Sequence, residues 1–128
     1  MSDPTLSRRA VACPGWRWLA GMRTACGLRV YSVKPPFPLG IREGDQRARP
    51  ECTALPHDAV PDLGDDLTVG GLEALVRERW GDGAHASPDR GRNPNPDWWV
   101  WRKIIDGWTV VARGPTRAAA LVAALDAP

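Results

Sequence analysis

Cys52, His57 and Asp58 are side chains of this 128-residue chain whose types match a nucleophile, a base and an orienting acid. A thiolate attacks, an imidazole takes the proton, and a carboxylate holds the imidazole in one tautomer. Such triads are defined by geometry in space, and these three residues fall in a proline-rich stretch that gives no reason for them to converge. We therefore predict that the protein is not an enzyme.

Metal-binding side chains are present but badly spaced. Structural zinc sites use short paired spacings such as C-x₂-C, and the chain has none. Calcium loops need alternating oxygen ligands, which its aspartates do not provide. The candidate zinc ligands are Cys13, Cys26, Cys52 and His57. The candidate ligands for a hard cation are Asp58, Asp62, Asp65 and Asp66. We predict no metal and no cofactor, and the odd number of cysteines predicts reduced thiols in a cytosolic protein.

Tryptophan and arginine suggest binding rather than catalysis. Four of the seven tryptophans lie between Asn95 and Thr116, on both sides of the Asp106-Gly107 pair. An Asp-Gly pair between two alternating apolar runs predicts a β-hairpin, because glycine tolerates a positive φ. A two-residue turn at this pair predicts three cross-strand neighbours: Ile105 with Trp108, Lys103 with Val110, and Trp101 with Ala112.

The alternation divides the predicted hairpin into two faces. We expect one face to pack on the core, beneath the alanine-rich last helix: Trp99, Trp101, Ile105, Trp108, Val110 and Ala112, with Lys103 as an exception. The other face is mixed, and Trp98 with Arg102 is its expected exposed pair. Trp and Arg are favoured anchors at interfaces. The predicted interaction patch comprises Trp98, Arg102, Arg113 and Arg117.

Two helices flank this hairpin. Residues 67–81 place apolar side chains at helical spacing, with Thr68 as the predicted N-cap and Gly81 as the stop. The last helix begins after Thr116, its predicted N-cap, and its apolar stripe is Ala118, Leu121, Val122 and Leu125. A short strand is predicted near Ala84–Ser87.

We predict an α+β fold: a helix–three-stranded antiparallel sheet–helix domain over residues 67–128, preceded by an N-terminal β-hairpin and a long Pro-rich loop. Residues 1–12 are expected to be a flexible tail, and residues 13–33 the hairpin, with its turn near Ala25-Cys26-Gly27. Residues 34–66 contain six prolines and are expected to form an irregular connection.

Charge is unevenly distributed along the chain. The first fifty residues carry nine basic and three acidic side chains, whereas residues 51–82 carry two basic and eight acidic ones. The two regions attract each other, are solvated separately, or present a basic surface to an acidic partner. No apolar run is long enough for a signal peptide or a membrane span, so we expect a cytoplasmic protein.

The predicted order helix–strand–strand–strand–helix over residues 67–127 resembles a double-stranded-RNA-binding domain. In outline, Thr116, Arg117, Ala120, Ala123 and Ala124 match the small, basic start of that family's last helix and its Ala-Ala pair. The sequence departs from the family at Ala118 and Leu121, which stand where phosphate-contacting lysines would be. The resemblance therefore implies the layout but not the charge clamp.

Three stretches, "CPGWRWLAGMR", "PDLGDDLTVGGLEALVRERWGD" and "GPTRAAALVAAL", resemble small uncharacterised proteins encoded by phages and prophages of GC-rich bacteria. The resemblance implies an accessory protein that binds and occludes a host protein or ribonucleoprotein complex in the host cytoplasm, such as an anti-defence (anti-CRISPR-like) inhibitor. The alternative is a nucleic-acid-binding protein that uses the basic N-terminal half and the Trp/Arg hairpin face.

Overall fold

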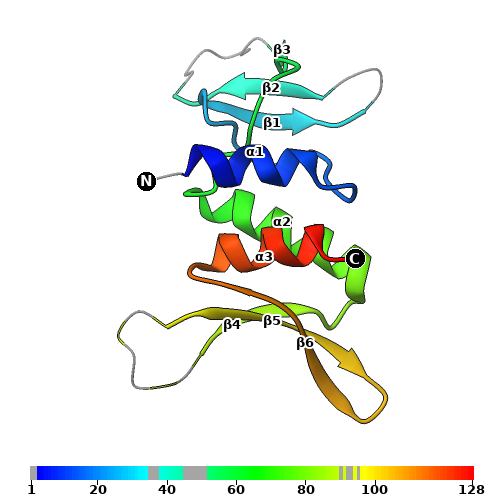
Figure 1. The fold of residues 1–128 in the computed structure, drawn as a ribbon. Helices are drawn as coiled ribbons and strands as arrows, with labels where there is room; N and C mark the ends of the chain where they lie inside the picture. Colours follow the sequence, from blue (N-terminus) through cyan, green and yellow to red (C-terminus); the bar gives the residue numbers. More distant parts are fainter. Residues whose placement is uncertain (1–2, 35–37, 45–51, 90, 92–93, 95) are drawn as a thin grey trace. The chain divides into compact units, whose positions relative to one another are not determined.

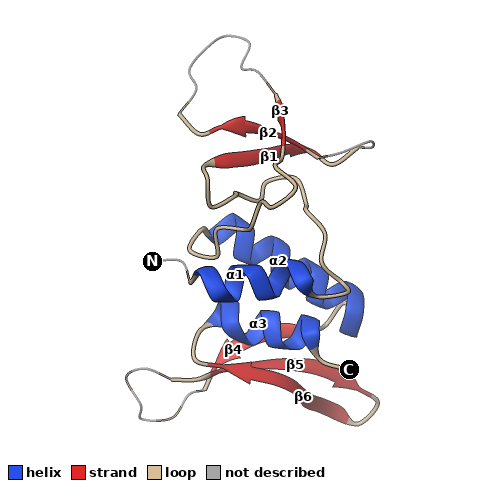
Figure 2. Cartoon of the chain, turned by 45° about the horizontal axis from the view of Figure 1, so that its top comes forward, coloured by secondary structure: helices blue, strands red, loops and turns tan. Residues whose placement is uncertain are grey.

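The computed structural model describes residues 3–34, 38–44, 52–89, 91, 94 and 96–128. These residues form an α+β fold with helices and two three-stranded antiparallel sheets, as predicted at the level of class (Figure 2). The helices are α1 (Pro4–Ala12), α2 (Asp66–Trp80) and α3 (Arg117–Asp126). The strands are β1 (Leu28–Ser32), β2 (Leu39–Arg42), β3 (Thr53–Ala54), β4 (His85–Pro88), β5 (Trp98–Ile104) and β6 (Gly107–Gly114).

The chain divides into two compact units. The first unit comprises Met1–Val11 and Arg17–Gly71, and the second comprises Ala12–Trp16 and Leu72–Pro128. Helix α2 contains the division, which falls between Gly71 and Leu72. Sheet β1–β2–β3 belongs to the first unit, and sheet β4–β5–β6 belongs to the second (Figure 1).

Helix α1 covers Pro4–Ala12 of the tail expected over residues 1–12, whose first two residues lie outside the described ranges. The Asp3 carboxylate accepts a hydrogen bond from the Thr5 backbone N–H at 2.9 Å, and the Asp3 carbonyl accepts from the Ser7 N–H at 3.0 Å. Pro4 supplies the first helical residue, where a missing N–H costs no hydrogen bond. Ser7 and Ala10 form the buried side of the helix.

The expected N-terminal hairpin is only partly present. Its turn forms as predicted: the Gly27 N–H donates to the Thr24 carbonyl at 3.1 Å, and Gly27 has φ +97°. The N–H of Val30 donates to the carbonyl of Met22 at 2.7 Å, so this segment does fold back on β1. Residues 16–19, however, are not a strand, and the main partner of β1 is β2. Strands β2 and β3 both lie in the stretch expected to be an irregular connection, whose residues 35–37 and 45–51 lie outside the described residues.

Helix α2 begins two residues before the predicted cap, because Asp65 rather than Thr68 caps it. The Asp65 carboxylate accepts from the Thr68 backbone N–H at 3.0 Å and from the Thr68 hydroxyl at 2.7 Å. The same carboxylate receives the Arg29 guanidinium at 2.7 Å. The Arg29 hydrogen bond, opposed by burial and reinforced by the bonds from Thr68, lowers the pKa of Asp65 to about 2.

We expect the Asp65→Asn variant to lose about 2 kcal/mol of unfolding free energy at neutral pH. Asparagine can still cap the helix, so the loss reports the contact with Arg29. Since the folded pKa of Asp65 lies below its usual value of 3.8, its stabilising effect is present above about pH 4 and disappears as the pH falls to about 2. Urea unfolding at several pH values measures this difference.

The matched control is Asp66→Asn, which removes the same charge from the exposed neighbouring position in the first turn of α2. Its effect should stay below about 1 kcal/mol, the contribution expected from the helix dipole. Stability curves for wild type and Asp65→Asn that run parallel down to acid pH would contradict the role given to Asp65.

In the second unit, helix α3 packs on the sheet β4–β5–β6 (Figure 1). Thr116 is its N-cap, as predicted, and its side chain accepts from the Ala119 N–H at 3.1 Å. The predicted apolar stripe of α3 is buried. Gly81, with φ +108°, ends α2 as predicted, and the indole N–H of Trp80 donates to the Ala124 carbonyl of α3 at 2.8 Å.

Candidate functional site

Strand register divides the second sheet into two faces. Residues directly opposite each other in neighbouring strands project from the same face. Trp99 lies opposite Ser87 and Arg113, whereas Trp101 lies opposite His85 and Val110. Lys103 lies opposite Trp108. We call the resulting set the aromatic face: His85, Ser87, Trp99, Trp101, Lys103, Trp108, Val110 and Arg113.

The other face of this sheet is covered by helix. Val100 projects from it and is fully buried. Gly114 also lies on this face, and a Cβ at Gly114 would come within 2.8 Å of the Ala120 backbone nitrogen in α3. Helix α3 is therefore in van der Waals contact with this side of the sheet, and Figure 1 shows no helix of the second unit on the aromatic face.

Ring contacts organise the aromatic face. The ring centres of Trp99 and Trp101 lie 6.1 Å apart, and the planes of the two rings are inclined by 17° to each other. The Arg113 guanidinium carbon lies 5.7 Å from the Trp99 ring centre, and His85 meets Trp108 edge-on at 5.1 Å. A depression of about 590 Å³ lies beside this cluster, lined in part by the two parallel indoles. Trp108 is 48% exposed.

The charged side chains around the aromatic face are two cations and one acid. Lys103 and Arg113 belong to the face, and the Asp89 carboxylate lines the depression beside the paired indoles. The Nδ1 of His85 lies 3.0 Å from the Gly83 carbonyl oxygen. A carbonyl only accepts, so Nδ1 carries the proton and the neutral imidazole keeps Nε2 as an acceptor. The face thus combines flat aromatic surfaces, two cations and an imidazole.

The four residues predicted as one interaction patch are distributed over three places. Arg113 lies on the aromatic face, whereas Trp98 and Arg102 lie on the helix-covered face. Trp98 and Arg102 are half-buried, as Trp99 and Trp101 are, so they are not the exposed pair that was expected. Arg117 lies at the start of α3, where its guanidinium donates to the Glu73 carboxylate at 3.1 Å.

The predicted core face and the predicted mixed face are exchanged, except that Ala112 faces the helix as predicted and Arg113 lies with the tryptophans. The expectation rested on an alanine-rich helix making room for large side chains, but close approach of a helix requires small residues on both surfaces. Ala86, Val100, Ala112 and Gly114 form that small-residue surface. The tryptophans expected in the core, Trp99 and Trp101, therefore lie on the opposite side of the sheet.

Two local errors in register accompany this exchange. The two-residue turn is Ile105-Asp106 rather than Asp106-Gly107, because Ile104 pairs with Gly107. A bulge then moves the later residues of β6: Trp101 pairs with Val110 but Val100 pairs with Ala112, and Val111 between them has no partner. The bulge places Arg113 opposite Trp99 instead of Trp98.

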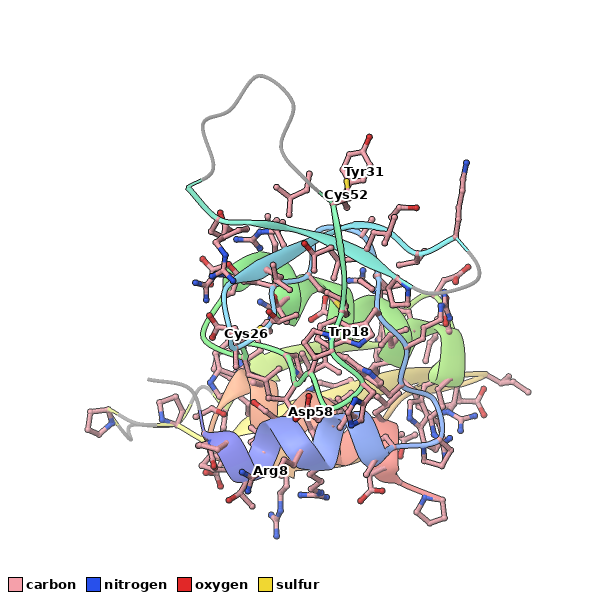
Figure 3. The ribbon with its side chains drawn as sticks, turned by 90° about the horizontal axis from the view of Figure 1, so that it is seen from above. Arg8, Trp18, Cys26, Tyr31, Cys52 and Asp58 are labelled. Atoms are coloured by element: carbon pink, nitrogen blue, oxygen red, sulfur yellow. The ribbon has the colours of Figure 1, made fainter. Side chains whose placement is uncertain are left out.

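The catalytic and metal-binding candidates do not form a site. Cys52, His57 and Asp58 are exposed, and Figure 3 shows Cys52 well separated from both Asp58 and Cys26. Two of the four aspartates are paired with arginines, Asp62 with Arg23 and Asp65 with Arg29. Across the part of the chain that the structure describes, no three His, Cys, Asp or Glu side chains gather as metal ligands.

Within those same described ranges, no helix has the length and apolar character needed to cross a bilayer. Ala118 and Leu121, the positions compared with the phosphate-contacting lysines of the double-stranded-RNA-binding family, are buried in α3. Comparisons of the chain with protein-family models, with curated proteins and with solved structures return no match.

Proposed function

We propose that the protein binds single-stranded nucleic acid on the aromatic face. The observation that carries this proposal is the parallel pair Trp99 and Trp101, beside the cations Lys103 and Arg113, on a sheet face that no helix of its unit covers. Indole rings provide stacking surfaces for bases, and arginine or lysine beside them contacts the phosphates.

The arrangement favours single strands over duplexes. Bases in a duplex already stack on one another and cannot reach the indoles, whereas the bases of a single strand can turn onto aromatic side chains. Base stacking tolerates any sequence because every base has a flat face. Sequence-independent binding of single strands is therefore the activity that the aromatic face supports best.

The salt dependence of binding tests this proposal. Two cations on the face predict a slope of about −1.4 when the logarithm of the association constant is plotted against the logarithm of salt concentration. The Arg113→Gln variant should reduce the slope to about −0.7. Fluorescence anisotropy of a labelled oligothymidylate of about 12 nucleotides measures both values.

Arg8→Gln is the matched control, because Arg8 is an exposed arginine of α1 in the first unit (Figure 3). It removes the same charge from the protein but not from the aromatic face, so the slope should remain that of wild type. Equal slopes for all three proteins, or tighter binding of a duplex of the same sequence, would contradict the proposal.

The second candidate is occlusion of a host protein, the activity implied by the resemblance to phage proteins. The observation that favours it is the apolar tip of the β5–β6 hairpin, where Ile105 is 100% exposed, Ile104 is 40% exposed and Trp108 is 48% exposed. Exposed apolar clusters of this kind are typical of protein interfaces.

A pull-down from bacterial lysate distinguishes the two candidates. Tagged wild type and the Ile105→Asp variant are compared with and without nuclease, and again at raised salt. A protein that is retained through nuclease and salt by wild type, and lost by Ile105→Asp, supports occlusion. Recovery that disappears with nuclease, and that Ile105→Asp preserves, supports nucleic-acid binding instead.

A further inference from the structure

A hollow of about 750 Å³ lies between the end of α2 and the tip of the β5–β6 hairpin, within the second unit. Its apolar wall includes Trp80, Ile104 and Ile105, and its cations are Arg102 and Lys103. The volume is in the range of small-molecule sites. The hollow includes none of the paired indoles proposed to stack on bases, and it shares Lys103 with the aromatic face.

Arg102 is held in place there without an acidic partner. Its guanidinium carbon lies 5.3 Å from the centre of the Trp80 ring, which is itself fixed by the indole hydrogen bond to Ala124. The Nε of Arg102 is shielded from solvent and, among the described residues, has no acceptor. A ligand in the hollow therefore meets other atoms of the Arg102 side chain, which lines it, and a carboxylate or phosphate oxygen is the acceptor that a guanidinium binds best.

The other charges around the hollow restrict which anion fits. Lys103 adds a second positive charge, but Asp82 and Asp106 also line the hollow. Their carboxylates repel a ligand that carries more than one negative charge. Because the remaining lining is largely apolar, a single carboxylate on an apolar body satisfies the hollow better than inorganic phosphate or a polyphosphate.

We propose that this hollow binds a monoanionic carboxylate carried on an apolar group, with the carboxylate against Arg102 and the apolar group against Trp80 and Ile104. Two sources share this chemistry: a small organic acid, and the free C-terminus of a peptide that ends in an apolar residue. The proposal does not depend on nucleic-acid binding, since Arg102, Trp80 and Ile104 lie outside the aromatic face and Lys103 is the side chain that both sites share.

Titration of the full chain with benzoate tests the proposal through the Nε–H signal of Arg102 in ¹H–¹⁵N NMR spectra. We expect a saturating shift with a dissociation constant on the order of 1 mM. Benzamide, which has the same ring but no charge, should bind at least tenfold more weakly, and phenyl phosphate should also bind more weakly than benzoate. A short peptide ending in phenylalanine, compared with its amidated form, separates the two sources.

Variants locate the binding. Arg102→Gln should weaken benzoate at least tenfold, and Arg102→Lys should weaken it less, because lysine keeps the charge but not the paired donors. The Asp82→Asn/Asp106→Asn double variant leaves Arg102 intact and should tighten phenyl phosphate severalfold. Arg113→Gln, on the aromatic face, should leave benzoate binding unchanged.

The proposal is overturned if benzamide binds as well as benzoate, or if the Arg102 signal does not shift at tens of millimolar benzoate. It is also overturned if folded Arg102→Gln or Arg102→Lys binds like wild type. Should the Arg102 variants fail to fold, an unchanged affinity for phenyl phosphate in the double aspartate variant would still overturn it.

Discussion

The Trp99→Leu/Trp101→Leu double variant is expected to bind single-stranded oligonucleotide about a hundredfold more weakly than wild type, or worse. Each base stacked on an aromatic side chain contributes about 1–3 kcal/mol, and this variant removes two stacking surfaces. Leucine keeps apolar bulk at both positions but has no π face. Anisotropy of a labelled oligothymidylate measures the loss without relying on the tryptophans that were removed.

Of the two single variants, Trp99→Leu should be the more damaging. The Arg113 guanidinium lies over the Trp99 ring, so removing that ring also frees a phosphate-binding cation from its position. Trp101→Leu removes a stacking surface but leaves the Arg113 guanidinium over the Trp99 ring. Similar losses from both single variants would mean that Arg113 does not depend on Trp99.

Tyr31→Leu is the control for the loss of an exposed aromatic ring. Tyr31 is 64% exposed on β1 of the first unit and is not part of the aromatic face. Its removal should leave the affinity unchanged. If the double variant stays folded and binds within threefold of wild type, base stacking on these indoles is refuted.

Gly114→Val is expected to lower the free energy of unfolding by about 3 kcal/mol, at the upper end of overpacking effects. A Cβ at this position would lie 2.8 Å from the Ala120 nitrogen and 2.9 Å from the Ala119 carbonyl carbon. These are backbone atoms of α3, so relief requires the whole helix to move away from the sheet. Thermal unfolding followed by circular dichroism should show a midpoint lower by roughly 10 °C.

Gly70→Ala is the matched control, since Gly70 is an exposed residue of α2 with open space where a Cβ would be. Alanine there should stabilise the protein by about 0.5–1 kcal/mol, because glycine is a poor helix former. A Gly114→Val midpoint within about 2 °C of wild type would show that α3 does not pack as tightly as the structure indicates.

Helix ends were predictable wherever the signal lies within a few residues. Thr116 and Gly81 were both identified from their types and neighbours, since a cap needs only the adjacent turn. A comparable signal was missed at α1, where Asp3 followed by Pro4 is an acceptor for the first turn and then a favoured first helical residue. At α2 the prediction preferred Thr68 over Asp65, because the ion pair that holds Asp65 comes from Arg29, which is distant in sequence.

The candidate site was less predictable than the helices. Alternation correctly grouped Trp99, Trp101, Lys103, Trp108 and Val110 on one side of the sheet, but alternation alone cannot say which side a helix will cover. The small residues opposite them did carry that information, since an alanine-rich helix can approach only a surface without bulk. The position of Arg113 could not be predicted, because a bulge at Val111, next to Val110, leaves no signal in the sequence.

The unpaired Val111 makes β6 one residue longer than the ladder requires. A chain lacking this residue could keep Val110 opposite Trp101 and Ala112 opposite Val100, with both faces of the sheet unchanged. Deletion of a residue between the bulge and Arg113 would instead turn Arg113 toward α3. Deletion of a residue between Trp108 and the bulge would turn Trp108 away from the aromatic face. Among descendants of this sequence, insertions and deletions in β6 should therefore accumulate at Val111. The rest of the strand should keep its number of residues.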